Sequence, residues 1–315
     1  MDTKPARPDD SSARMEAVTN QGEEHAGRGT ERNQESRIPR RADAATALGN
    51  DVRNDPAVKA RKQPPQHSVD ISEAAGVRYL HFGSDWVQGA MRIARPWSLE
   101  LAYTREMMAG LLLRDETDWP RSALLVGLGA GSLAKFIYRN LPECRIAVVE
   151  INPRVEFIAR QYFRLPDDPA RLAVVIGDGA DYMLAGDRRF DYILVDGFDP
   201  DARAGVLDTL PFYQACRVRL SDRGLLGVNL LGRSKGFAAS VERLEAAFDR
   251  RVAVFPSSDS GNTIAFATGG EPVEITLEAM RESAMRLKKA SGLDLRSTIS
   301  RLQLAHPLPG GVLKI

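Results

Sequence analysis

The sequence is poor in several features that would each mark a class of protein. Its 315 residues include only Cys144 and Cys216 as cysteines, too few for a disulfide framework or a cysteine zinc site. No apolar run reaches 18 residues, so we expect no membrane span, and the N-terminus lacks the apolar core of a signal peptide. The formal net charge of +1 argues against nucleic acid as the main partner. These absences predict a soluble, cytoplasmic protein.

Aromatic residues are missing from the first part of the chain. Residues 1–70 contain no Phe, Trp or Tyr and few aliphatic side chains larger than alanine, whereas charged residues, Gln, Ser and Pro are common. Such a segment buries too little apolar surface to offset the entropy of ordering it. We therefore predict a disordered tail over residues 1–70. Its acids and bases are mixed, which is not typical of a nucleic-acid-binding arm.

Aromatic residues begin at Tyr79, and a small folded region follows. Residues 77–94 partly alternate between apolar and polar side chains, which favours a β-hairpin, and residues 98–113 have helical spacing. We assign residues 71–118 to a small N-terminal β/helix region that precedes a larger domain at 119–315.

The larger domain alternates short apolar runs with segments of helical spacing. The apolar runs are 123–129, 145–150, 171–178, 190–196 and 224–231, and the helical segments are 132–140, 153–163, 179–185, 209–220 and 236–248. This alternation predicts an α/β fold with a doubly wound parallel sheet. Residues 251–256 and 262–268 indicate a final antiparallel hairpin, and residues 276–302 indicate two C-terminal helices broken at Gly292.

Glycines lie between the first apolar run and the first helix of this domain. Gly127, Gly129 and Gly131 have the spacing G-x-G-x-G, which differs from the G-x-G-x-x-G of dinucleotide-binding folds. Glycine allows unusual backbone angles and close approach of a ligand. A tight strand-to-helix turn without any ligand would use glycines too, so the loop alone leaves both interpretations open.

Acidic residues end the next three strands and give the loop a context. Glu150, Asp178 and Asp196 would all meet at the carboxyl edge of the sheet, where open α/β folds bind ligands. A carboxylate such as Glu150 can accept both hydroxyl groups of a ribose, so the sequence predicts a nucleoside site. Asp199 adds a second acid after the fourth strand, although Asp199-Pro200 could simply begin a turn.

Several segments together resemble the spermidine synthase (aminopropyltransferase) family. They are "VVEINP", "VVIGDGADYM", "DYILVDGFDP" and "LDTLPFY", followed by Pro256, Ser260, Gly261 and Phe266. The resemblance covers roughly residues 77–270. It implies a Rossmann-like sheet of the AdoMet-methyltransferase type. It also implies transfer of an aminopropyl group from decarboxylated S-adenosylmethionine to a polyamine such as putrescine, without a metal.

The resemblance also implies roles for individual residues. Cofactor binding falls to Gly127, Gly129, Gly131, Glu150, Asp178 and Gly179, with Glu150 on the ribose and Asp178 and Gly179 on the adenine. Asp196 would be the catalytic residue facing the reacting amine, and Asp199 and Tyr103 would bind the amine substrate. Family members commonly form dimers or tetramers, which points to a homodimer.

The sequence departs from the family pattern in the amine pocket. Ala130 stands where the family has an acid that binds the amino group of the aminopropyl arm, and Ser258 stands where it has a tyrosine. The glutamine after the family's pocket tyrosine is absent, and Asn229 replaces a glutamine after the fifth strand. Two alternatives therefore stay open: an AdoMet-dependent methyltransferase, and a noncatalytic relative that binds a nucleoside or a partner protein. Many methyltransferases have an acid two residues before the first glycine of the loop. This chain has Leu125 at that position, which does not favour the methyltransferase.

Overall fold

A computed structural model describes residues 68–83, 86–114, 118–199, 203–257 and 261–315. The tail predicted at residues 1–70 lies outside the described residues, apart from its last three. Ser258 and Ser260, singled out in the sequence, also lie outside them.

The described residues form a central sheet of seven strands, in the order β6-β5-β4-β7-β8-β10-β9. The strands are β4 (Ser122–Val126), β5 (Arg145–Glu150), β6 (Leu172–Ile176), β7 (Phe190–Val195), β8 (Leu220–Leu231), β9 (Val252–Val254) and β10 (Asn262–Ala267). The first five are mutually parallel, whereas β10 runs antiparallel to both β8 and β9. The predicted α/β fold, with its parallel strands and final hairpin, is confirmed.

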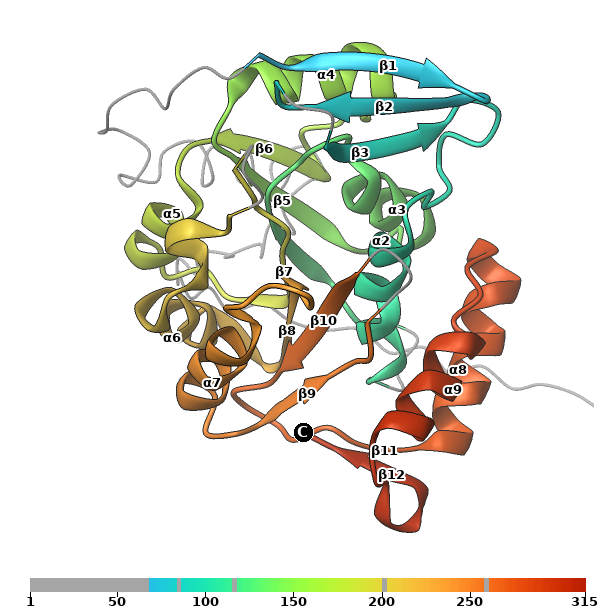
Figure 1. Cartoon of the computed structure of the whole chain (residues 1–315), viewed down its shortest axis with the longest axis vertical. Coiled ribbons are helices and arrows are strands. Elements are labelled where there is room, and N and C mark those ends of the chain that lie inside the picture. Colours follow the sequence, from blue (N-terminus) through green and yellow to red (C-terminus); the bar gives the residue numbers. More distant parts are fainter. Residues whose placement is uncertain (1–67, 84–85, 115–117, 200–202, 258–260) are drawn as a thin grey trace, which may run out of the picture. The chain divides into compact units, whose positions relative to one another are not determined.

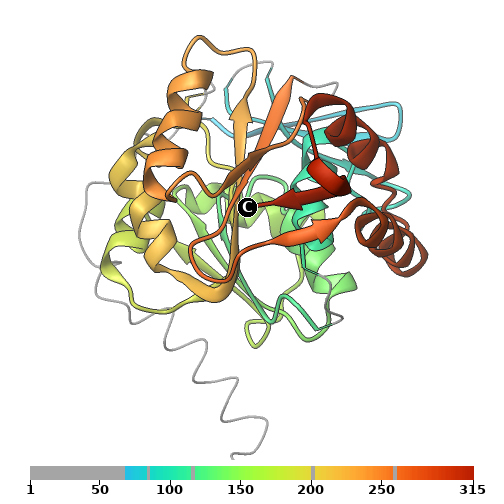
Figure 2. The same ribbon diagram turned by 90° about the horizontal axis from the view of Figure 1, so that it is seen from below.

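Helices cover both faces of this sheet, which explains why its strands read as continuous apolar runs. Along β4, Ala123 and Leu125 join one hydrophobic core while Leu124 and Val126 join another, because successive side chains point to opposite faces. The first core includes α3 (Ser132–Asn140) and α4 (Pro153–Phe163), and the second includes α5 (Gly179–Ala185), α6 (Leu210–Val218) and α7 (Phe237–Ala247). Figures 1 and 2 show these two helical layers on either side of the sheet.

Local capping chemistry sets the starts of the helices closest to the site. Asn152 caps α4 by accepting a hydrogen bond from the Arg154 backbone N–H at 2.9 Å, and Pro153 occupies the first turn. Thr209 caps α6 in the same way, accepting from the Phe212 N–H at 3.4 Å. Helices α3, α4 and α5 match the predicted bounds, and α6 and α7 are slightly shorter than predicted.

The N-terminal region contains more strand and less helix than predicted. The hairpin expected at 77–94 exists as β2 (Val77–His81) and β3 (Val87–Arg92), but β1 (Asp70–Ala74) adds a third antiparallel strand. The helix expected at 98–113 is α2 (Ala102–Met107) followed by the 3₁₀ turn η2 (Met108–Leu112).

The C-terminal segment forms two helices, as predicted. Helix α8 (Leu277–Ser291) ends at Gly292, whose φ of +78° is the left-handed conformation typical of a helix end, and α9 (Arg296–Ala305) follows. Two short strands that the sequence did not indicate, β11 (Glu274–Thr276) and β12 (Val312–Lys314), pair antiparallel around them. The remaining 3₁₀ turns are η3 (Gly205–Asp208) and η4 (Pro309–Gly311).

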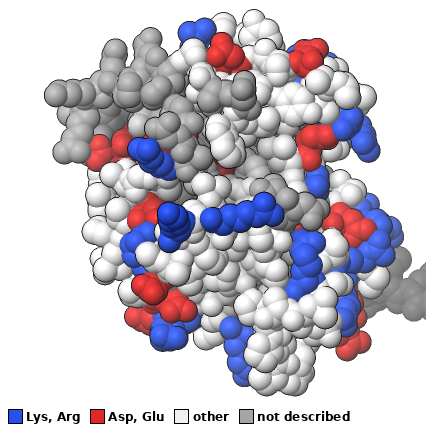
Figure 3. All heavy atoms as spheres, in the orientation of Figure 1, with Lys and Arg blue, Asp and Glu red and all other residues white. Residues whose placement is uncertain are grey.

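Charged side chains of both signs are interspersed on the face shown in Figure 3, in keeping with the net charge of +1. Within the described ranges, no helix is long and apolar enough to cross a bilayer. No group of three or more His, Cys, Asp or Glu side chains in the same ranges is placed to hold a metal ion.

Candidate active site

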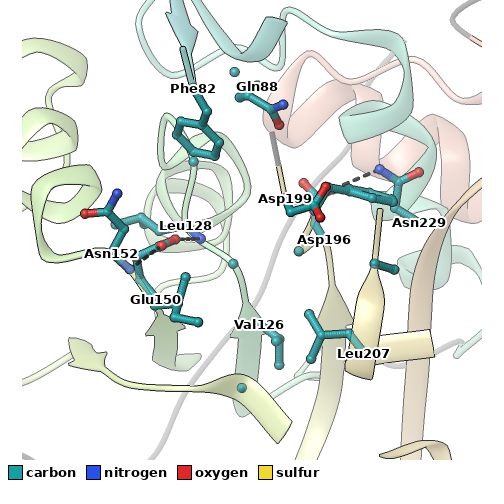
Figure 4. Close-up of a pocket in the computed structure, with 18 of the residues that line it drawn as sticks. Phe82, Gln88, Val126, Leu128, Glu150, Asn152, Asp196, Asp199, Leu207 and Asn229 are labelled. Atoms are coloured by element: carbon teal, nitrogen blue, oxygen red, sulfur yellow. Dashed lines mark hydrogen bonds between the residues drawn. The ribbon is translucent and has the colours of Figure 1, made fainter. Parts of the chain in front are cut away.

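A cavity of about 450 Å³ lies at the carboxyl ends of the parallel strands. This volume falls in the usual range for small-molecule sites, about 300–1,000 Å³. Its walls come from the β2–β3 hairpin, α2, the glycine loop after β4, the loops after β5, β6 and β7, the end of β8 and the start of β10 (Figure 4). The predicted site residues that line it are Tyr103, Gly127, Gly129, Glu150, Asp178, Gly179, Asp196 and Asp199.

The glycine loop passes so close to other backbone that side chains would not fit. A Cβ atom on Gly127, which has φ +98°, would lie 2.3 Å from the Asp196 carbonyl oxygen, and one on Gly129 would lie 3.1 Å from that of Gln88. Gly131 behaves differently, because it caps α3, packs against Leu165 and is not among the residues that line the cavity. The sequence grouped all three glycines with the cofactor, but only the first two line its proposed site.

Glu150 is buried and holds the glycine loop in place. Its carboxylate accepts hydrogen bonds from the backbone N–H groups of Leu128 and Asn152, each at 2.9 Å. Burial raises the pKa of Glu150, and these backbone donors oppose that rise by stabilising the charged form. The same carboxylate also receives backbone hydrogen bonds from Gly129 and Ile151, and it lines the cavity. We call the part of the cavity formed by Leu128, Glu150 and Asn152 the Glu150 end.

Asp178 caps the helix that follows β6. Its carboxylate accepts from the backbone N–H groups of Ala180 at 2.7 Å and Asp181 at 3.1 Å, which fixes its orientation at the start of α5. Gly179, next to it, packs tightly on β4, because a Cβ there would lie 2.5 Å from a methyl group of Val126. Both residues face the cavity between the Glu150 end and η3.

Asp196 lies at the opposite end of the cavity, within a chain of polar side chains. Its carboxylate accepts a hydrogen bond from the Asn229 amide at 2.8 Å and another from the Tyr103 hydroxyl. The Asn229 carbonyl in turn accepts from the Asn262 amide at 3.0 Å. Figure 4 shows Asp196, Asn229 and Asp199 grouped together, away from Glu150. We call the part formed by Tyr103, Asp196 and Asn229 the Asp196 end.

The electrostatics of the Asp196 end favour proton exchange. Burial raises the pKa of Asp196 above its ordinary value, while the bonds from Asn229 and Tyr103 act in the opposite direction. The pKa of Tyr103 is raised well above 10.0 by burial and by the negative charge of Asp196, so its hydroxyl stays protonated and donates. A carboxylate with a raised pKa that faces a cavity is a candidate for general acid–base chemistry.

Asp199 combines a turn with a place on the cavity wall. Its N–H donates to the Arg203 carbonyl at 2.9 Å, and its carboxylate accepts from the Arg203 N–H at 2.8 Å. The side chain is exposed and lines the cavity near Asp196 (Figure 4). The turn-forming role that the sequence left open is therefore present, together with a position that a bound amine could reach.

Comparisons with known proteins identify the family. The sequence model of the spermine/spermidine synthase domain matches residues 100–229. A polyamine aminopropyltransferase of Neisseria meningitidis is 36% identical over 242 residues, which cover 77% of this chain and 91% of that protein. The chain belongs to the polyamine aminopropyltransferase family, a family of transferases.

Solved structures share the fold. A spermidine synthase in complex with the transition-state analogue AdoDATO superposes with a TM-score of 0.58, at 22% identity, over 79% of this chain and 85% of that one. Human methyltransferase-like protein 13, in complex with SAH, superposes with a TM-score of 0.54 at 26% identity, over 61% of this chain and 93% of that one. The first match supports the fold, and the second shows that a methyltransferase-like protein shares it.

One departure from the aminopropyltransferase pattern is visible in the glycine loop. Ala130 is buried, and it packs directly against β3, since a Cβ on Gly89 would lie 2.6 Å from its methyl group. The wall at this point is therefore apolar, where the resemblance implied an acid. The equivalent of the family's hairpin tyrosine, Ser258, lies outside the described residues.

Sequence reasoning missed several residues of this aminopropyltransferase site. In the sequence, Asn229 stands out only as a replacement of the family's glutamine, yet it is buried and donates to Asp196. A lone amide in the apolar strand "LLGVNLL" was a usable signal, because a buried amide requires partners. Phe82 and Gln88 reach the cavity from the β2–β3 hairpin, and nothing in their local sequence distinguishes them from ordinary hairpin residues.

Proposed function

We propose that this enzyme transfers an aminopropyl group from decarboxylated S-adenosylmethionine to a polyamine such as putrescine. The observation that carries the proposal is the Asp196 end, where a carboxylate of raised pKa is held by Tyr103 and Asn229 inside the same cavity as Glu150. Acidic side chains at both ends suit a reaction whose two reactants are cations, because a cavity of one sign concentrates ligands of the opposite sign.

The chemistry is a displacement at carbon. The lone pair of the acceptor amine attacks the aminopropyl carbon bonded to the sulfonium sulfur, and a C–N bond forms as the C–S bond breaks. The bonding electrons move to sulfur, which leaves as a neutral thioether, and the new ammonium loses one proton. The donor is therefore consumed as a substrate, and no oxidant or metal enters the balance.

Asp196 would act on the proton of the acceptor amine. A primary alkylamine has a pKa of about 10.4, so forming the free amine at pH 7 costs roughly 4–5 kcal/mol. The Asp196 carboxylate attracts the ammonium, and its raised pKa brings it closer to taking the proton. Tyr103 and Asn229 hold the carboxylate in one orientation, and Asp199 adds a second negative charge for a substrate with two amines.

The Glu150 end would hold the nucleoside. The resemblance assigns the two hydroxyls of a ribose to the Glu150 carboxylate, which lines the cavity. We expect Asp178 and Gly179, which line the cavity, to contact the edge of an adenine, whose exocyclic amino group would donate to the carboxylate. Gly127 and Gly129 also line the cavity, and the resemblance assigns them to donor binding.

Methyl transfer from S-adenosylmethionine is a second candidate, favoured by one observation. Ala130 leaves the glycine loop without the acid expected to bind the amino group of the aminopropyl arm, and its methyl group is buried against Gly89. S-adenosylmethionine, if it does not need that acid, would bind this loop as well as decarboxylated S-adenosylmethionine does. The similarity to methyltransferase-like protein 13 points the same way.

Calorimetry and turnover assays separate these candidates. Tight binding of methylthioadenosine, preference for the decarboxylated donor and formation of spermidine from putrescine would support aminopropyl transfer. Preference for intact S-adenosylmethionine, without transfer to putrescine, would favour the methyltransferase. Failure to bind any of the three nucleosides would refute the proposed function and leave a noncatalytic relative.

Two finer points accompany the proposal. We expect the enzyme to act in the cytoplasm, and to do so as a homodimer by resemblance to the family. Light scattering after size exclusion would measure the mass of the particle, and a monomer would refute the second point.

A further inference from the structure

The helix that carries Tyr103 depends on contacts with other parts of the fold. Helix α2 has six residues, and no side chain caps its start. A helix this short is marginal by itself, because few hydrogen bonds offset the cost of nucleation. The position of the Tyr103 hydroxyl against Asp196 must therefore be set by tertiary contacts to α2.

Two such contacts hold the last turn of α2. The Tyr192 hydroxyl, from β7, donates to the Met107 carbonyl. Arg301, from α9, donates to the carboxylate of Glu106, and these two residues are 195 positions apart in the sequence. One contact ties α2 to the strand that ends at Asp196, and the other ties it to the C-terminal helices.

The ion pair between Glu106 and Arg301 is partly buried, with the Arg301 side chain 34% exposed. The Glu106 side chain is 10% exposed, and its second oxygen has no hydrogen-bond partner among the described residues. Leaving a buried carboxylate without its cation is strongly unfavourable. If Arg301 moves, Glu106 must therefore move with it, and if Arg301 is removed, Glu106 must move toward solvent. Ile299 and Leu302, on either side of Arg301, belong to the same large hydrophobic core as Met107.

Tyr103 and Glu106 are three residues apart and are therefore neighbours on the surface of α2. A movement of Glu106 would rotate or shift this short helix as a unit, and the Tyr103 hydroxyl would move with it. The cavity lining includes Tyr103 but neither Glu106 nor Arg301, so any effect of the ion pair on a bound ligand must pass through α2.

We propose that Arg301 is a positioning residue for Tyr103, acting through Glu106, so that α9 belongs to the machinery of the Asp196 end. The inference rests on the proposed function, in which Tyr103 and Asp196 orient the acceptor amine. It assigns a role to a residue outside the range matched by the family model, residues 100–229.

A double-mutant cycle tests the inference through catalysis. Arg301→Gln should lower kcat for aminopropyl transfer roughly 10- to 100-fold, because small misplacements near a reacting group have effects of this size. In a Tyr103→Phe background the same substitution should lower kcat less than about twofold, since the group it positions is already gone. Arg281→Gln is the matched control, because it removes the 2.8 Å bond from Arg281 to Gln303 between α8 and α9 without touching α2. An equal loss from Arg301→Gln in both backgrounds, or no loss in the wild-type background, would overturn the inference.

Hydrogen exchange tests the same coupling without any need for turnover. Arg301→Gln should speed exchange of the backbone amides of residues 102–107, Arg301→Lys should restore most of the protection, and Arg281→Gln should leave it unchanged. Unchanged exchange in Arg301→Gln would overturn the inference. If the wild-type enzyme transfers no aminopropyl group, the proposed function fails, and the exchange data alone then decide whether Arg301 positions α2.

Discussion

The two ends of the cavity hold their carboxylates in different ways. At the Glu150 end, the partners are backbone N–H groups, from Leu128 and Asn152, which lie 22 and 2 positions away in the sequence. At the Asp196 end, the partners are the side chains of Tyr103 and Asn229, from α2 and β8. Any sequence that makes the same turns supplies the first set of donors, whereas the second set requires particular residues on distant elements.

Because of this difference, substitutions should change the geometry of the Glu150 end less than that of the Asp196 end. Backbone donors survive almost every substitution, so the Glu150 end should vary little in geometry among chains of this fold. Side-chain donors can be exchanged one at a time, and each exchange changes both the direction and the pKa of the Asp196 carboxylate. Acceptor chemistry is therefore the property that this architecture leaves open to change.

The largest expected effect is at the reacting end. Asp196→Asn should lower kcat at least about 100-fold, because general acid–base groups typically contribute 10²–10⁴-fold. Its affinity for methylthioadenosine should stay within about twofold of wild type, since the nucleoside would be held at the other end. Steady-state kinetics with putrescine and calorimetry with methylthioadenosine measure the two quantities. A variant that turned over at the wild-type rate would remove Asp196 from the mechanism.

The converse result is expected at the Glu150 end. Glu150→Gln should weaken nucleoside affinity about 10- to 100-fold, since hydrogen bonds to a charged group contribute roughly 1.5–3 kcal/mol. The value of kcat at saturating donor should fall much less. Calorimetry and a donor titration of the rate give both numbers. If kcat fell as far as in Asp196→Asn, the two ends would not have separate roles.

A smaller effect should appear in the pH profile when a side-chain donor is removed. Asn229 lowers the pKa of Asp196 by stabilising its charged form, so Asn229→Leu should raise that pKa further. The acid limb of the pH profile of kcat/KM should then move upward by about one pH unit, which corresponds to about 1.36 kcal/mol of lost stabilisation of the charged carboxylate. Asn140→Leu, at the end of α3, is the control, since its amide donates to the Phe136 carbonyl and Asn140 does not line the cavity. A limb that stayed in place would mean that Asp196 does not govern it.

The smallest effect concerns stability. Because burial raises the pKa of Asp196 in the folded chain above its ordinary 3.8, folding takes up protons between the two values and stability falls as pH rises through that window. The Tm of Asp196→Asn should therefore lie a few degrees above that of wild type at pH 8, since 1 kcal/mol of unfolding free energy shifts Tm by about 2–4 °C. The difference between the two Tm values should close as the pH is lowered toward 3.8. Asp222→Asn, at an exposed site, should show no such dependence, and scanning calorimetry across pH decides the point.

How far the sequence could predict the molecule follows the same division. The bounds of α3, α4 and α5 were predictable, because strands buried on both faces and helix caps such as Asn152 are local signals. The convergence of Glu150, Asp178 and Asp196 was also predictable, since parallel strands bring their carboxyl ends to one edge. The partners of Asp196 were not, because Tyr103, Asn229 and Asn262 meet through contacts between distant segments. Strand β1 was missed for a similar reason, since its exposed residues show no apolar alternation.

The reversed direction of β10 has a consequence for how the cavity is built. An antiparallel strand begins at the edge of the sheet where its parallel neighbours end, and Asn262 is the first residue of β10. The amide that orients Asn229 therefore comes from the start of a strand, whereas the acidic residues of the site follow the ends of strands. In a wholly parallel sheet this amide would have to come from a loop, so the antiparallel β9–β10 hairpin both extends the sheet and forms part of the cavity wall.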